Sequence, residues 1–289
     1  MGISIGLFPA GPTSSAVDVP GVGVGHVTIW SDDPAPPEGE GVARTGVTAI
    51  DFGGNMWQSP IPAGGSVLNG NGECTGLTMI RECGVLETPI FLTSTMQVGR
   101  VYDGAVTALV AEEPMIGVAD VIIPVVAECD DSFLSDPRRV RVTETDVATA
   151  LARARENAGA GQPPEQGSVG AGSGMCALGY KGGIGTASRV LPDGHIVAVV
   201  AMTNYGEHAR LTVDGLPVGK LLPDPAAAEA HPKPAGSCIV VVITDGPLDA
   251  AGCSRLAARA GLGLARTGST AHHGSGEIFL AVATGLRTR

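Results

Sequence analysis

The sequence predicts a layered α/β protein, because short β-branched apolar runs alternate along the chain with segments of helical periodicity. Apolar residues make up 44% of the chain and aromatic residues only 3%, so a sizeable core must be built from Ala, Val, Leu and Ile. The strand-like runs, several apolar enough for burial on both faces, are 22–29, 121–126, 195–202, 239–244 and 278–284.

Three segments between these runs have helical patterns. Residues 101–112 are rich in Ala and Val, and 248–260 place Leu and Ala at helical spacing, with Gly261 as the expected residue after the helix end. Thr143 and Asp146 form a capping-box pattern that predicts a helix through about Asn157.

The distribution of turn residues favours one domain over residues 1–289. Segment 158–167 combines Gly, Pro and Gln and predicts an exposed loop. Segment 222–235 contains four prolines and predicts a surface arm, because a strand-like run begins soon after it. Glycine-rich turns are spread evenly, and no repeat of solenoid length is visible.

Charge and cysteine usage exclude several classes of protein. The formal net charge is −11 and no basic stripe occurs, so nucleic-acid binding is not expected. The six cysteines lack metal-site spacing and indicate free thiols in a reducing compartment. No basic region precedes the first apolar stretch, and no apolar run reaches 18 residues, so we expect neither a signal peptide nor a membrane span. A cytoplasmic protein without a cofactor or metal is predicted.

The junction Gly236–Ser237 is the strongest candidate for chemistry. A small hydroxyl residue stands at the start of a buried strand-like run, in PKPAGSCIVVVITD, with glycine before it. Glycine tolerates unusual backbone angles, so the Ser237 hydroxyl could attack a strained Gly236 carbonyl and cut the chain. The new α-amine, with an unperturbed pKa of about 8, would then serve as the base for the hydroxyl. The alternative is an ordinary Gly-Ser turn leading into a strand.

Ordered motifs over nearly the whole chain place this junction in a family context. Among them are DVPGVGVGHV (18–27), RTGVTAI (44–50), LNGNG (68–72), PVVAE (124–128), SVGAGSGM (168–175), KGGIGTASR (181–189), NYG (204–206) and GSGEIF (274–279). With them the chain resembles the L-aminopeptidase/D-esterase family of N-terminal-nucleophile hydrolases, which includes the β-peptidyl aminopeptidases. The resemblance implies a four-layer αββα sandwich of the type shared with self-cleaving ornithine acetyltransferases. It also implies autocleavage into chains 1–236 and 237–289, and a homotetramer of these processed heterodimers.

The resemblance also implies roles for individual residues. Ser237 takes the position of the nucleophile, and Ser275 and Glu277 fall where the family has a second serine and a carboxylate near it. Asn204 matches an oxyanion-hole asparagine, although Asn in Asn-Tyr-Gly is also a common turn residue. Glu128 matches the acid that receives the free amine of the substrate, which would be a small peptide, amide or ester with an L-, D- or β-amino acid.

One position departs from the family pattern. Where the family commonly has a tyrosine after Ala-Glu-Thr, this chain has Asp130, and an ionised Asp cannot donate a hydrogen bond to an oxyanion. Loss of one such donor costs roughly 3–4 kcal/mol in other enzymes. Tyr205 and Tyr102 are candidate replacements, and Asp130 beside Glu128 and Asp131 also predicts a more negative entrance for a more cationic substrate.

Other interpretations stay open at this point. Asp130 allows a weakly active or uncleaved relative that serves in binding or assembly, and a third option is an amine acyltransferase, although those enzymes have Thr at the cut. His272 and His273 suggest a metal site but lack a further ligand at suitable spacing, so a polar loop is preferred. The glycines of 181–185 lack the spacing of a phosphate-binding loop and favour a tight turn between strands.

Overall fold

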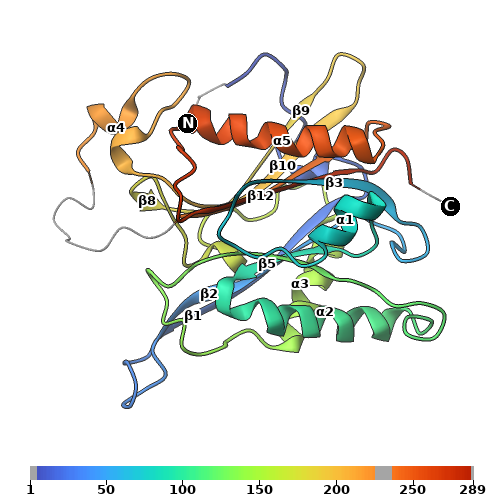
Figure 1. Cartoon of the computed structure of the whole chain (residues 1–289), viewed down its shortest axis with the longest axis horizontal. Helices are drawn as coiled ribbons and strands as arrows, with labels where there is room; N and C mark the ends of the chain where they lie inside the picture. Colours follow the sequence, from blue (N-terminus) through green and yellow to red (C-terminus); the bar gives the residue numbers. More distant parts are fainter. Residues whose placement is uncertain (1–4, 225–235, 288–289) are drawn as a thin grey trace.

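The computed structural model describes residues 5–224 and 236–287 and has four layers. Two β-sheets are stacked face to face, with helix α5 covering one outer side and helices α2 and α3 covering the other (Figure 1). The αββα sandwich predicted from the family resemblance is therefore confirmed.

A six-stranded mixed sheet combines β3 and β4 with four strands from the second half of the chain. Its order is β4-β3-β12-β11-β10-β9, and the only parallel pair in it is β11 with β12. The strands are β3 (Ile61–Gly70), β4 (Val85–Leu86), β9 (Gly183–Val190), β10 (Ile196–Asn204), β11 (Ser237–Thr244) and β12 (Gly276–Ala283). Both β11 and β12 are buried along their whole length, as their continuous apolar runs predict.

The second sheet has four strands in the order β1-β2-β5-β6. They are β1 (Gly23–Asp32), β2 (Val42–Asp51), β5 (Ile90–Ser94) and β6 (Val125–Cys129), and β5 pairs with β6 in parallel. A small separate hairpin, β7 (Cys176–Ala177) with β8 (Tyr180–Lys181), lies before β9.

Five α-helices are present in the described ranges 5–224 and 236–287. They are α1 (Leu77–Cys83), α2 (Val98–Glu112), α3 (Glu144–Asn157), α4 (Val218–Leu221) and α5 (Ala250–Thr267), and short 3₁₀ turns occupy 16–18, 95–97, 170–172 and 208–210. The predicted capping box opens α3, because Thr143 Oγ1 accepts from the Asp146 N–H at 3.2 Å and the Asp146 carboxylate accepts from the Thr143 N–H at 2.8 Å.

Three apolar clusters hold the layers together. The largest lies between the sheets, where side chains such as Ile50, Leu92 and Ala127 face Met202, Ile239 and Leu280. A second cluster packs the four-stranded sheet against α2 and α3, and a third packs the six-stranded sheet against α5. Each sheet therefore buries both faces, which explains why its strands lack clean polar–apolar alternation.

The predicted elements differ from the observed ones mainly at their ends. The helix predicted for 248–260 continues to Thr267, and Gly268, with φ +108°, ends it instead of Gly261. Gly261 lies inside α5, where a Cβ would come within 3.3 Å of Leu68 and 3.4 Å of Phe279, so this glycine serves close packing. The strand predicted for 121–126 begins only at Val125.

Segment 158–167 forms the predicted loop, without helix or strand. Most of the predicted arm 222–235 lies outside the described residues, since only 222–224 of it are described. Within the described ranges, no helix has the length and apolarity needed to cross a bilayer.

Candidate active site

The topology brings four strand ends to one place. Asn204 is the last residue of β10, and it pairs with Ser237, the first residue of the antiparallel β11. Ser237 in turn pairs with Gly276 at the start of the parallel β12. The end of β6, with Glu128 and Cys129, packs across β10 and β11 from the other sheet. All candidate site residues from the sequence therefore gather at one edge of the sandwich.

Ser237 is 4% exposed and follows the half-buried Gly236. Gly236 lies where β10 and the Ser275 side chain come close to the chain. Its role is close approach, because a Cβ there would lie 3.1 Å from the Asn204 carbonyl oxygen and 3.3 Å from Ser275 Oγ. The Gly236 carbonyl accepts from the Gly276 N–H at 3.1 Å, which fixes the junction against β12.

The Asn204 side-chain amide is held in one orientation. Its Oδ1 accepts from the Cys176 N–H at 2.9 Å, and its Nδ2 donates to the Asp130 carbonyl at 2.8 Å. The same Nδ2 lies 3.5 Å from Ser237 Oγ. An amide nitrogen carries two hydrogens, so one remains for charge that develops on an oxygen beside Ser237.

Ser275 and Glu277 form a buried pair beside Gly236. The Ser275 hydroxyl donates to Glu277 Oε1, and the two residues are each 1% exposed. Glu277 Oε2 has no partner in hydrogen-bonding geometry among the described residues, although the Asn69 amide lies close enough to lower the carboxyl pKa. Burial outweighs these contacts and raises the pKa of Glu277. The pair has the composition needed to hold an ammonium or pass a proton where the Ser237 nitrogen lies.

Glu128 is 3% exposed and is held at both oxygens. Its Oε1 accepts from the Glu73 N–H at 2.9 Å, and its Oε2 accepts from the Thr95 hydroxyl. Burial raises the pKa of Glu128, the Thr95 and Glu73 donors oppose this rise, and the nearby acids Asp130 and Glu73 add to it. A buried carboxylate of this kind gains most from a cationic partner such as a substrate ammonium.

Several contacts around the site have no local sequence signal. Thr95 and Cys176 approach through strand pairing and loop packing across many residues. Cys129 is fully buried, and its sulfur lies beside the Ser237 hydroxyl, which lowers the thiol pKa against the larger opposing effect of burial. Only its position directly after Glu128 could have pointed to Cys129.

The structure changes the interpretation of Asp130. Both of its carboxylate oxygens are engaged by Ser132, from the N–H and the hydroxyl at 2.9 Å each, while its main-chain carbonyl holds Asn204. The proposed tyrosine replacements are wrong. The Tyr205 hydroxyl contacts Thr267 Oγ1 at 2.8 Å in the core beneath α5, and Tyr102 packs in the core beneath α2 and α3.

Two further sequence features have structural explanations. His272 Nε2 lies 3.3 Å from Glu207 Oε1 at the rim of the site, and residues 5–224 and 236–287 contain no cluster of three metal-ligating side chains. The tight turn predicted at 181–185 is wrong in extent, because only Gly182 lies outside β8 and β9, and a Cβ on Gly182 would lie 2.3 Å from the Thr203 carbonyl oxygen.

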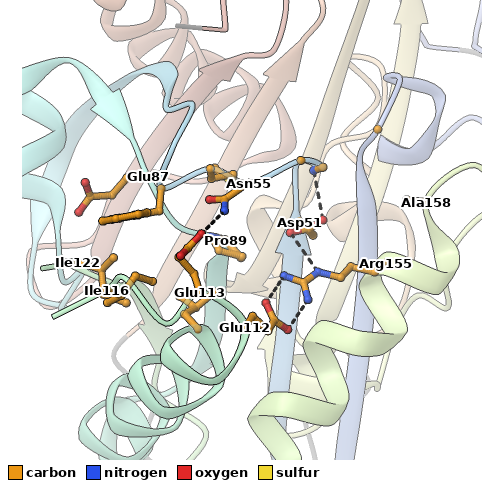
Figure 2. Close-up of a pocket in the computed structure, with 16 residues that line it drawn as sticks. Asp51, Asn55, Glu87, Pro89, Glu112, Glu113, Ile116, Ile122, Arg155 and Ala158 are labelled. Carbon is orange, nitrogen blue, oxygen red and sulfur yellow. Dashed lines mark hydrogen bonds and ion pairs between the residues drawn. The ribbon is translucent and has the colours of Figure 1, made fainter. Parts of the chain in front are cut away.

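A cavity lies away from these residues. It measures about 620 Å³ and lies at the Asp51 end of β2, the opposite end of the four-stranded sheet from Glu128. Its charged side chains already pair with protein groups, since Arg155 contacts Glu112 and Asp51, and Asn55 donates to Glu113 (Figure 2). The cavity is therefore separate from the cluster around Ser237.

Comparison with known proteins agrees with this geometry. The model of peptidase family S58 matches residues 14–289. The chain belongs to this family. It is 38% identical to the β-peptidyl aminopeptidase BapA of Sphingosinicella xenopeptidilytica, over 95% of this chain and 70% of that protein.

Two solved structures of similar proteins have the same fold. A β-aminopeptidase from a Burkholderia species superposes with a TM-score of 0.86 at 43% identity, covering 99% of this chain and 77% of that one. The second is the L-aminopeptidase D-Ala-esterase/amidase of Ochrobactrum anthropi, described as a serine aminopeptidase and a variant of the Ntn-hydrolase fold. It superposes with a TM-score of 0.87 at 36% identity, covering 98% of this chain and 77% of that one. This S58 chain is accordingly a hydrolase of the serine aminopeptidase type.

Proposed function

We propose that this S58 peptidase cuts its own chain between Gly236 and Ser237 and then hydrolyses amides or esters that carry a free N-terminal amine. The observation that supports this most directly is the position of Ser237. It is buried at a strand end, with the Asn204 amide 3.5 Å from its hydroxyl and with Ser275 against Gly236 on the other side.

In the self-cleavage step, Ser237 Oγ attacks the Gly236 carbonyl carbon. The C–O bond forms, the hydroxyl proton passes to the leaving nitrogen, and the peptide C–N bond breaks to give an ester and a free amine. Water then hydrolyses the ester, leaving a carboxylate on Gly236 and the restored Ser237 hydroxyl. The hydrogen bond from the Gly276 N–H holds the Gly236 carbonyl in place.

In turnover, the freed Ser237 amine is the base for its own hydroxyl. The hydroxyl attacks the substrate carbonyl while Asn204 Nδ2 donates toward the developing oxyanion, and the amine passes the proton to the leaving group. Water then releases the acyl group by the reverse path. Glu277, through Ser275, sets the proton affinity of the amine, and Glu128 pairs with the substrate ammonium.

Intact-mass spectrometry tests the first step. Wild-type protein should give the fragments 1–236 and 237–289, whereas Ser237→Ala should remain one chain. Activity on aminoacyl nitroanilides should rise with pH as an amine of apparent pKa near or below about 8 deprotonates. An uncut wild-type chain that still turns over these substrates, or a flat profile from pH 5 to 9, would refute the amine-base mechanism.

A second candidate, a cleaved but weakly active relative with a binding role, is favoured by the missing hydroxyl donor at Asp130. Complete cleavage together with no turnover on a panel of L-, D- and β-aminoacyl nitroanilides would support it. Turnover of any panel member at rates typical of enzymes would exclude it.

The assembly and location are also proposals. We infer a single hydrolase domain that works in the cytoplasm as a tetramer of processed heterodimers. The cytoplasmic assignment is supported by the free thiols of all six cysteines. Light scattering of the processed protein tests the tetramer.

A further inference from the structure

One ammonium group binds the turn that contacts the candidate oxyanion donor Asn204. Lys181, at the end of the β7–β8 hairpin, donates from Nζ to three main-chain carbonyls, those of Met175 at 2.8 Å, Gly172 at 3.3 Å and Gly182 at 3.5 Å. These carbonyls belong to the turn before Cys176 and to the link into β9. Three carbonyl dipoles that converge on one cation form a strong local clamp.

This turn is what holds Asn204. The Cys176 N–H, one residue after Met175, donates to Asn204 Oδ1 at 2.9 Å. Gly182, on the other side of Lys181, donates its N–H to Met175 O at 2.8 Å and approaches the backbone of Thr203, the residue before Asn204. The clamp therefore adjoins both the side-chain partner and the backbone of Asn204.

The orientation of an asparagine amide depends on such partners. If Oδ1 lost the Cys176 N–H, rotation of the amide could exchange oxygen for nitrogen toward Ser237, and an oxygen there would repel an oxyanion. The Asp130 carbonyl, 2.8 Å from Nδ2, favours the same orientation from the other end. On the Cys176 side, the Lys181 ammonium bonds to the turn at Gly172 and Met175.

We propose that Lys181 is a positioning residue for the reaction: its ammonium holds the 172–176 turn so that Asn204 presents an N–H to the oxyanion. The inference rests on the proposed function of Ser237 and Asn204. Lys181 contacts neither Ser237 nor a substrate atom in this arrangement, and it acts only through Cys176 and Asn204. Because Lys181 is an exposed residue, water can replace some of its hydrogen bonds, so the effect is smaller than deletion of the donor itself.

Kinetics of the processed enzyme give the first test. Lys181→Met should lower kcat on an aminoacyl nitroanilide roughly 10- to 100-fold, as expected for a misplaced catalytic group. KM should stay within about threefold, because ground-state binding through Glu128 is untouched. Lys181→Arg, which keeps several donors, should recover most of kcat, and Lys220→Met, at an exposed lysine on α4, should behave as wild type.

Inhibitor binding distinguishes a positioning role of Lys181 from a general loss of structure in the β7–β8 hairpin. 1-Aminoethylboronic acid accepts the Ser237 oxygen on boron and forms a tetrahedral anion that resembles the intermediate, whereas alaninol has the same amine but cannot form it. Lys181→Met should weaken binding of the boronic acid by about the same factor as it lowers kcat, and it should leave binding of alaninol nearly unchanged. Asn204→Ala should show the same pattern with a larger loss.

The outcomes are distinguishable. If wild-type protein binds the boronic acid no better than alaninol, the proposed function fails. Suppose instead that wild type binds the boronic acid more tightly than alaninol. If Lys181→Met keeps the same ratio of the two affinities, or loses affinity for both compounds alike, the Lys181 inference fails while the proposed function stands. Should Lys181→Met be insoluble, Lys181→Gln, which keeps an uncharged donor, replaces it, and an unchanged inhibitor ratio in that variant overturns the inference.

Discussion

Three acids close together in the sequence have three different environments in the fold. Glu128 is buried and held by donors, Asp130 is half-buried and bonded to Ser132, and Asp131 is 3% exposed with its pKa raised to about 6 by burial. From sequence alone they form one negative entrance. Of the three, Glu128 is the carboxylate that we propose receives the substrate ammonium.

Replacement of Glu128 by glutamine tests that role. The amide keeps the shape but cannot neutralise a substrate ammonium, and the lost charge-assisted contact corresponds to about 1.5–3 kcal/mol, or roughly 10- to 100-fold in kcat/KM. The loss should appear mainly in KM. It is measured with an aminoacyl nitroanilide and with the matching acyl nitroanilide that lacks the amine, for which the two proteins should differ little. Equal losses on both substrates would contradict the assignment.

The raised pKa of Glu128 also predicts a pH dependence. Because the ionised form binds the ammonium, KM of the wild type should rise as pH falls through this raised pKa. The Glu128→Gln variant has no group to titrate there, so its KM should be flat over the acidic range. A wild-type KM that stays constant from pH 7 to 5 would contradict this prediction.

Strands and helices with strong periodicity were predictable, but their ends were not always. The runs that became β10, β11 and β12 were found within a few residues, because burial on both faces leaves a continuous apolar signal. The end of α5 was misplaced because Gly261 resembles a helix terminator by type alone. Its packing against Phe279, and the contact of Gly268 with the Arg210 carbonyl, depend on distant segments.

The glycines of α5 allow a direct test of this distinction. A Cβ at Gly263 would meet nothing within 4 Å, so Gly263→Ala should stabilise the helix by about 0.5–1 kcal/mol through intrinsic propensity. Gly261→Ala gains the same propensity, but the Leu68 and Phe279 side chains must yield, so its gain should be smaller or negative. Denaturant unfolding of both variants measures the difference, and equal stabilisation would contradict the packing role of Gly261.

The residues of the candidate site also divide into those that the sequence predicts and those that it does not. Family motifs predicted five of its residues, and the strand register brings all five to one edge of the sandwich. These residues are Ser237, Ser275, Glu277, Asn204 and Glu128. Thr95, Cys176 and Lys181 were not found as parts of the site. Their contacts depend on how loops far apart in the sequence pack, and no local residue pattern encodes that.

At the scale of the whole molecule, burial sets the direction of the pKa shift for five carboxyl groups. Burial raises the pKa of each of these groups, which are Asp51, Glu87, Glu128, Asp131 and Glu277. A carboxyl whose pKa is higher in the folded than in the unfolded state favours folding when it is protonated. Its contribution is therefore lost as pH rises from the unfolded toward the folded pKa. For these groups, folding stability should decrease from mildly acidic to neutral pH.

Asp131 is the clearest case, because its folded pKa of about 6 compares with an ordinary value of 3.8. The difference corresponds to about 3 kcal/mol of stability that is present below pH 4 and lost by about pH 7. Asp131→Asn removes this titration while the other buried acids remain, so the variant should gain stability relative to wild type as pH rises from 4 to 7. Urea unfolding at both pH values measures the gain, with Ser237→Ala as the background if self-cleavage prevents refolding. A stability difference between the two proteins that does not change with pH would show that Asp131 ionises as readily in the folded chain as in the unfolded one.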